Sequence, residues 1–373
     1  MPKFSVLGYS EVVKQDAKVV MLAPGIFDKK GGMFAYANLW VDEIKKYNSN
    51  AILLLDHKNR SGLVEGVEYQ RFISERKKWG LAIALIAYLF STKLSHPFFS
   101  DYLKNIERQS TVHILTSSLL AYPLVKALLN SKRNLTIIYT LHDPMPHDEK
   151  VSVVAKLIKG SFLNKLFNLS AHHEDFYLHL HSVQLIQDCP PNIGNVIVHP
   201  HPLPKTMVEK KQRIKNNKVR FGFLGRIEPY KGLDVLYKAF KNIQSDDLVK
   251  GNVELEIVGR GHIDIKKWEQ LDIPVNLVVR MVSDEEFHRH MANLDCLILP
   301  YKKASQSGVG YLALAYGIPI IATDTGGLPE IIAQSKSNLS KLVPIDDEKE
   351  LTRAILEFIN KIDKSGSEAI NQG

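Results

Sequence analysis

Short apolar runs alternate with helix-like patterns along most of this chain. Ala51–Asp56, Cys296–Pro300 and Pro319–Thr323 are runs of this kind, apolar at nearly every position. Since the side chains of a strand point alternately to its two faces, such strands are buried on both faces. Buried strands separated by helices are typical of parallel sheets that helices cover on either side. The alternation therefore predicts a doubly wound α/β architecture.

The same pattern gives the expected elements. In the first half, we expect strands at Val19–Pro24, Ala51–Asp56, Val112–Thr116, Leu135–Asp143 and Asn195–His199, and helices at Met33–Tyr47, Ser117–Asn130 and Glu149–Leu166. In the second half, we expect strands at Val219–Gly225, Val253–Gly259, Val275–Val279, Cys296–Pro300, Pro319–Thr323 and Leu342–Ile345, and helices at Gly232–Ile243, Ser283–Leu294, Val309–Tyr316, Leu328–Ala333 and Asp347–Ile362.

The alternation is interrupted once, at His199–Lys218, which is rich in proline and then strongly basic. A length of 373 residues also suits two domains rather than one. We expect a Rossmann-like domain over residues 1–203, a linker over 204–218 and a second Rossmann-like domain over 219–355. Residues 356–373 would form a helix end and tail that pack back on the first domain. The two domains would face each other across a cleft, with ligands at the carboxyl ends of the strands.

The basic charge of the chain lies in its first half. Residues 1–205 hold 24 Lys and Arg against 17 Asp and Glu, a balance of +7 out of a formal net charge of +8. A basic half suits an anionic membrane, a nucleic acid or a phosphorylated substrate. The two cysteines, Cys189 and Cys296, are far apart and lack metal-ligand spacing, which favours a reducing compartment. The N-terminus does not read as a signal peptide, and we expect a cytoplasmic protein.

The longest apolar run is Trp79–Phe90, with basic residues on both sides. It is too short to cross about 30 Å of hydrocarbon. It fits either a buried core helix or an interfacial helix that rests on the inner face of a membrane.

Loops of glycine, small polar residues and cations follow the expected strands of the second half. The loop residues that stand out are Gly225, Arg226, Lys231, Gly259, Arg280, Val282, Ser305, Gln306, Ser307, Gly308 and Val309, together with Thr325–Gly327. Helices that begin at such loops point backbone N–H groups and a partial positive charge at one spot. Arginine adds a planar fork and lysine a point charge for phosphate. Each loop alone is weak evidence, but together they predict a site for a nucleotide diphosphate.

These motifs resemble those of the group 1 (family 4) retaining glycosyltransferases, which have the GT-B fold. The resembling segments are GRIEPYKG, IVGRG, SQSGVGYLALAYGIPIIA and TDTGGLPEII, within residues 219–333, and more loosely APGIFDKKGGMFAYANLW and TLHDPMPH. The resemblance implies that the second domain holds a nucleotide diphospho-sugar and the first domain holds the acceptor. It places Arg226 and Lys231 on the diphosphate, Gly31 and Gly32 on the facing glycine-rich loop, and His142 beside the donor sugar. It implies neither a metal nor another cofactor.

The chain departs from this family at the family's paired glutamates. Their positions fall on Ala304 and Leu312, and no Asp or Glu occurs between Asp295 and Asp324. Neutral groups of Ser305, Gln306 and Ser307 would then contact the sugar, with Tyr311 as a weak candidate for the ribose. Because the leaving diphosphate can itself accept the proton of the acceptor, catalysis needs cations at the diphosphate more than it needs a carboxylate.

Other sites fit the sequence less well. His172, His173, His179 and His181 lack the cysteines or carboxylates that would complete a metal site. Asp56 ends a strand as a ribose-binding acid would, but no GxGxxG precedes it, so we reject a dinucleotide site.

The sequence thus predicts a glycosyltransferase that moves a sugar from a nucleotide sugar, with UDP favoured and GDP-mannose as the alternative, to a glycan or lipid-linked acceptor. Three other functions stay open: a sugar-nucleotide 2-epimerase, a catalytically silent nucleotide-sugar-binding protein and a nucleic-acid-binding protein. The last ranks lowest because the basic residues are not interleaved with aromatics.

Overall fold

The computed structural model describes residues 5–13, 17–23, 32–46, 48, 51–55, 103, 106–116, 121–142, 153–210 and 218–368. For residues 32–35, 54–55, 153–159 and 363–368 it describes the backbone alone. The chain divides into two compact units, Met1–Pro202 and Leu203–Gly373. Each unit is an α/β domain built on a parallel sheet, which confirms the predicted fold class.

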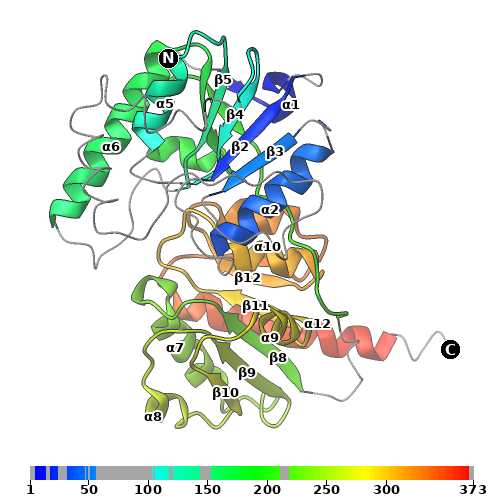
Figure 1. The fold of residues 1–373 in the computed structure, drawn as a ribbon. Coiled ribbons are helices and arrows are strands. Elements are labelled where there is room, and N and C mark those ends of the chain that lie inside the picture. Colours follow the sequence, from blue (N-terminus) through cyan, green and yellow to red (C-terminus); the bar gives the residue numbers. More distant parts are fainter. Residues whose placement is uncertain are drawn as a thin grey trace. The chain divides into compact units, whose positions relative to one another are not determined.

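The described part of the first unit contains a seven-stranded parallel sheet of order β1-β7-β6-β5-β4-β2-β3 (Figure 1). Its strands are β1 (Val6–Leu7), β2 (Val19–Ala23), β3 (Ala51–Leu55), β4 (Thr111–Ile114), β5 (Thr136–Thr140), β6 (Phe176–Leu180) and β7 (Val196–Val198). Its helices are α1 (Tyr9–Val12), α2 (Gly32–Lys45), α5 (Ala121–Leu129) and α6 (Val153–His172), with a 3₁₀ turn at Gln184–Asp188.

The two faces of this first sheet differ in polarity. One face packs Val112, Ile137 and Phe176 against α5 and α6 in an apolar core. The other face packs against α1 and α2 and carries buried polar side chains as well as apolar ones. Because strand side chains alternate, polar residues at every second position share this face.

Three elements of the first unit were not expected from the sequence: β1, α1 and β6. The run that forms β6, FYLHL, contains a histidine that reads as polar. The helix before it, α6, also continues to His172, beyond its expected end at Leu166. The expected segments Trp79–Phe90 and Asp56–Lys58 lie outside the described residues.

The second unit has a six-stranded parallel sheet of order β10-β9-β8-β11-β12-β13. The strands are β8 (Val219–Leu224), β9 (Val253–Val258), β10 (Val275–Val278), β11 (Cys296–Leu299), β12 (Ile320–Thr323) and β13 (Lys341–Val343), so all six expected strands are present. The chain moves outward from β8 to β10 and then returns to β11 on the other side of β8. The boundary between β8 and β11 is therefore the topological switch point, where sheets of this kind bind ligands.

Helices cover this second sheet in two layers (Figure 1). They are α7 (Leu233–Ile243), α8 (Ile265–Trp268), α9 (Asp284–Ala292), α10 (Gly308–Ala315), α11 (Leu328–Gln334) and α12 (Glu348–Glu368), with a 3₁₀ turn at Pro229–Lys231. The final helix, α12, packs against α7, and α10 packs against α11. Right-handed crossovers place these two pairs on opposite faces of the sheet.

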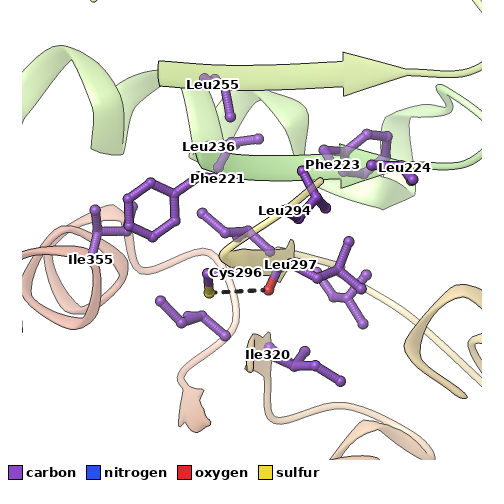
Figure 2. Close-up of a cluster of buried hydrophobic side chains, with 14 of the residues drawn as sticks. Phe221, Phe223, Leu224, Leu236, Leu255, Leu294, Cys296, Leu297, Ile320 and Ile355 are labelled. Atoms are coloured by element: carbon purple, nitrogen blue, oxygen red, sulfur yellow. Dashed lines mark hydrogen bonds between the residues drawn. The ribbon is translucent and has the colours of Figure 1, made fainter. Parts of the chain in front are cut away.

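The core of the second unit lies where β8 and β11 pair at the switch point. Phe221, Leu297 and Ile355 are all buried there, from β8, β11 and α12 (Figure 2). Gly222 has no room for a side chain, because a Cβ there would lie 2.5 Å from the Leu294 side chain. This dense packing fixes β8 and β11 and hence the loops that leave their carboxyl ends.

None of the described helices is long and apolar enough to cross a membrane.

Candidate functional site

Four loops of the second unit leave the sheet at its carboxyl edge, beside the switch point. They follow β8, β9, β11 and β12 and contain the glycines and cations that the sequence singled out. Two of them turn through glycines with positive φ, Gly225 at 128° and Gly259 at 153°. A Cβ on Gly259 would lie 1.7 Å from the carbonyl oxygen of Gly225, so the turns after β8 and β9 touch through their backbones.

The loops after β8 and β11 are joined directly. The Lys302 amide donates to the carbonyl oxygen of Tyr230 at 2.8 Å. Gly232 has a φ of 69°, and a Cβ there would lie 1.8 Å from the carbonyl oxygen of Pro300. Only glycine fits this close approach, which holds the loop that carries Lys231 against the loop that carries Tyr301.

Lys231 lies over an aromatic ring. Its ammonium nitrogen is 3.5 Å from the ring centroid of Tyr301 and 5.1 Å from that of Tyr230. An ammonium above a ring face is attracted by the ring quadrupole. Among the described residues, no carboxylate forms an ion pair with Lys231.

The neighbouring Lys302 is held differently. Its ammonium forms ion pairs with Asp234 at 2.8 Å and Asp346 at 2.9 Å. These hydrogen bonds raise the pKa of Lys302. Its charge is therefore balanced within the protein, whereas the charge of Lys231 is available for an anion.

Arg226 lies in the same loop and points to a carboxylate of that loop. Its guanidinium contacts Glu228 at 3.0 Å and donates to the Tyr230 hydroxyl at 3.5 Å. Burial raises the pKa of Tyr230 to about 12, so this hydroxyl stays protonated at neutral pH. The arginine is largely exposed, and the exposed pair with Glu228 is weak enough for an incoming phosphate to compete with it.

The first turn of α10 completes this edge. The Ser307 hydroxyl caps α10 by accepting from the Gly310 amide at 3.3 Å. Gly308 is exposed, and a Cβ there would meet no atom within 4 Å. The Val309 side chain would lie 3.6 Å from a Cβ on Gly225, so α10 begins beside the turn after β8. The first turn of α10 therefore begins at the same edge of the sheet as the loop that carries Lys231.

Ser305 and Gln306 pack against the glycine loop after β12. The Gly327 amide donates to the carbonyl oxygen of Ser305 at 3.2 Å. The Gln306 side-chain amide lies against Gly327, where a Cβ would come within 2.5 Å of its nitrogen. Both terminal atoms of Gln306 are buried and have no hydrogen-bond partner among the described residues. Gly327 thus leaves room for the glutamine beside the start of α10.

The structure places Arg280 and Val282 further from the switch point, after the edge strand β10. The Arg280 guanidinium makes two hydrogen bonds to the Glu286 carboxylate, at 2.5 and 3.0 Å. Val282 is half-buried and packs against the core. Arg280 is therefore engaged within the protein, and its pairing with Glu286 was not expected from the sequence.

In the first unit, His142 follows β5 at the carboxyl edge of that sheet. Its Nε2 donates to the carbonyl oxygen of Leu115 at 2.8 Å, which fixes the protonated nitrogen. The ring of Tyr36 packs edge-on against the His142 ring, with the two ring centroids 4.9 Å apart. Gly32 is the first residue of α2, and Gly31 lies outside the described residues.

A buried hydrogen-bonded chain crosses the polar face of the first sheet, from α1 to the residue after β7. The Tyr9 hydroxyl donates to His113 Nδ1 at 2.9 Å, and His113 Nε2 donates to Thr140 Oγ1 at 2.8 Å. Thr140 donates to His179 Nδ1 at 3.0 Å, and His179 Nε2 donates to the carbonyl oxygen of His199 at 3.2 Å. Burial lowers the pKa of His113 and His179, which favours neutral rings, and for neutral rings the final acceptor fixes every tautomer in this chain.

A second branch ends on the same carbonyl oxygen. His181 Nδ1 donates to His199 at 3.1 Å, and the Tyr36 hydroxyl donates to His181 Nε2 at 2.9 Å. Burial lowers the pKa of His113, His179 and His181 well below the usual value. From the sequence, His179 and His181 were considered only as metal ligands, and this chain was missed because its partners come from elements that are far apart in the sequence. Among the described residues, no cluster of His, Cys, Asp and Glu fits a metal ion.

Comparison with known proteins finds a likeness to one family in the second unit. The sequence pattern of the family described as glycosyl transferases group 1 matches residues 218–361. An uncharacterised glycosyltransferase of Methanocaldococcus jannaschii is 26% identical over 266 residues, which are 69% of this chain and 68% of that protein.

Solved structures match over most of the chain. Sucrose-phosphate synthase of Thermosynechococcus elongatus superposes with a TM-score of 0.62 at 14% identity, covering 92% of this chain and 90% of that one. A trehalose-6-phosphate protein of E. coli bound with UDP-2-fluoro glucose gives a TM-score of 0.58 at 11% identity, with coverage of 91% and 90%. At these identities the likeness concerns the fold.

Proposed function

We propose that the chain is a glycosyltransferase, which transfers a hexose from a UDP-sugar with retention of configuration. The GT-B fold and the match of residues 218–361 to the group 1 glycosyltransferases support this proposal. The acceptor in this proposal is a glycan or a lipid-linked glycan of surface polysaccharide synthesis. GDP-mannose is the alternative donor. The UDP-sugar analogue bound to a protein of the same fold supports the choice of UDP.

One observation carries the proposal: a lysine that pairs with no carboxylate among the described residues, an exposed arginine and a helix N-terminus lie together at the switch point. Lys231, Arg226 and the first turn of α10 all lie beside the carboxyl ends of β8 and β11. Such preorganised positive groups stabilise charge that develops on a leaving diphosphate. We propose that these groups, rather than a metal ion, offset the diphosphate charge.

The proposed reaction needs no carboxylate nucleophile. The bond between the sugar C1 and the diphosphate oxygen breaks, and the acceptor oxygen bonds to C1 on the same face. The acceptor proton moves to the departing diphosphate. This route suits a chain without Asp or Glu between Asp295 and Asp324, in which Ser305, Gln306 and Ser307 would contact the sugar with neutral groups.

We further propose that the protein works in the cytoplasm, at the inner face of a membrane. The balance of +7 over residues 1–205 supports contact with anionic lipids or a phosphorylated acceptor.

The missing acids also favour a second candidate, a catalytically silent protein that binds nucleotide sugars. The test is incubation of the full chain with UDP-, GDP- and dTDP-sugars and a crude lipid extract, followed by analysis of lipid and nucleotide products. Transfer of sugar to lipid or glycan with retained configuration is the expected result. Binding without turnover would favour the silent protein, and an epimerised free nucleotide sugar would overturn the proposal in favour of a 2-epimerase.

A further inference from the structure

The Lys231 ammonium lies closer to the ring of Tyr301 than to that of Tyr230. We propose that Tyr301 is a positioning residue, which holds the Lys231 ammonium on its ring face and so presents an unneutralised, fixed charge to the donor diphosphate. This inference rests on the proposed function and adds to it a residue for which neither the motifs nor the family resemblance gave a role.

The ring of Tyr301 is itself immobilised. The residue is 1% exposed, and its ring packs against the ring of Phe223 with centroids 6.5 Å apart. Its backbone carbonyl accepts from the Thr323 hydroxyl at 2.5 Å. A platform that is fixed by packing and backbone hydrogen bonds fixes the ammonium above it, at 3.5 Å from the ring centroid.

A neutral ring holds a cation without cancelling its charge. Lys302, in the neighbouring loop, is held in a different way, because Asp234 and Asp346 bind its ammonium and neutralise its charge. A carboxylate in place of Tyr301 would likewise consume the charge that a diphosphate needs. The ring limits the positions that the lysine side chain can take, while the N–H groups of its ammonium can still donate hydrogen bonds to an anion.

The hydroxyl of Tyr301 makes a second link to the site. It lies 3.4 Å from the Ser307 hydroxyl, which caps α10 through the Gly310 amide. One side chain therefore touches both the cation and the helix start that flank the proposed diphosphate. The ring and the hydroxyl should have separable effects.

The test varies the electron density of the ring while its shape is kept. Position 301 is filled with phenylalanine and with phenylalanines that bear one, two or three fluorine atoms, since fluorine weakens the attraction of a ring for a cation. Binding of UDP to each full-length variant is measured by calorimetry, alongside Tm. GDP replaces UDP if the wild type binds GDP instead. Affinity should fall stepwise along the series, by about 2- to 30-fold in total.

UDP affinity is then measured for the same series in a Lys231→Gln background, which shows whether the ring acts through the lysine. If Tyr301 acts through the lysine, fluorination should then leave UDP affinity unchanged. A merely structural role would give the same slope in both backgrounds, and a flat series in the wild-type background would also overturn the inference.

A matched control tests whether any tyrosine under a lysine has this effect. Tyr237 is buried on α7 and carries Lys267 over its ring at 4.3 Å, away from the switch point. Tyr237→Phe should leave UDP affinity unchanged, and a change as large as that of the position 301 series would overturn the inference. If the wild type binds no nucleotide at all, the proposed function fails; if Lys231→Gln weakens binding but the fluorine series is flat, only the role of Tyr301 fails.

Discussion

Acidification should destabilise the first unit far more than the second. His113, His179 and His181 are fully buried and neutral in the folded state, with each pKa well below the usual 6.5. In the unfolded chain they titrate near 6.5, so the unfolded state binds more protons below that pH. Their stability contribution is therefore present above pH 6.5 and lost as the pH falls below it.

The size of the loss follows from proton linkage. When the pH falls from 7.5 to 5.5, each histidine that stays neutral in the folded state lowers the free energy of unfolding by about 1.4 kcal/mol. If all three histidines stay neutral down to pH 5.5, the loss reaches about 4 kcal/mol, a large share of the stability of an ordinary domain. All three rings belong to one network, through Thr140 and the His199 carbonyl oxygen, so a proton on any of them opposes formation of the same network.

Hydrogen exchange with peptide resolution measures the two units in one sample. Peptides from β4, β5 and β6 should lose protection between pH 7.5 and 5.5, after correction for the intrinsic exchange rate. Peptides from β8 and β9 should lose much less, because the second unit has no fully buried histidine among its described residues. Equal losses in the two units, or unchanged protection of β4 to β6, would refute the reasoning.

Three further outcomes follow from the site. Lys231→Ala should lower kcat by about 10²- to 10³-fold, and an unchanged kcat with the identified donor would show that the lysine does not assist departure of the diphosphate. Gln306→Ala should weaken donor affinity or alter sugar preference in a competition assay, and the proposed sugar contact is wrong if both stay as in the wild type. Gly232→Ala should destabilise the second unit by more than about 1 kcal/mol in a urea titration that follows that unit, because a Cβ would collide with Pro300; a wild-type transition would contradict the close approach of these loops.

The sheet of the second unit could be predicted because most of its strands are largely apolar, and two of them are followed by glycines. β8 ends before Gly225 and β9 before Gly259, and both glycines take backbone conformations that other residues rarely adopt. The resemblance to group 1 glycosyltransferases rests on these same loops and is confirmed. In the first unit, β6 escaped detection because its buried histidine reads as a solvent-facing residue, and only long-range partners make its burial tolerable.

Side-chain pairing at the site was beyond sequence reasoning. Lys231, Lys302 and Arg280 all read as loop cations, yet one lies on a ring, one between two carboxylates and one on Glu286. These differences depend on partners that are distant in the chain or on small shifts of the loops. The sequence predicts that these side chains are cations, but only the structure shows which of them are already paired with a carboxylate.

The most direct test of the account is a calorimetric titration of UDP into the wild type, Lys231→Ala and Lys302→Ala. Loss of a charge-assisted hydrogen bond should weaken binding by about tenfold or more in Lys231→Ala. Lys302→Ala should bind nearly as the wild type does, because Asp234 and Asp346 already balance that charge. Equal weakening in both variants, or wild-type affinity in Lys231→Ala, would contradict a donor site at the β8–β11 switch point.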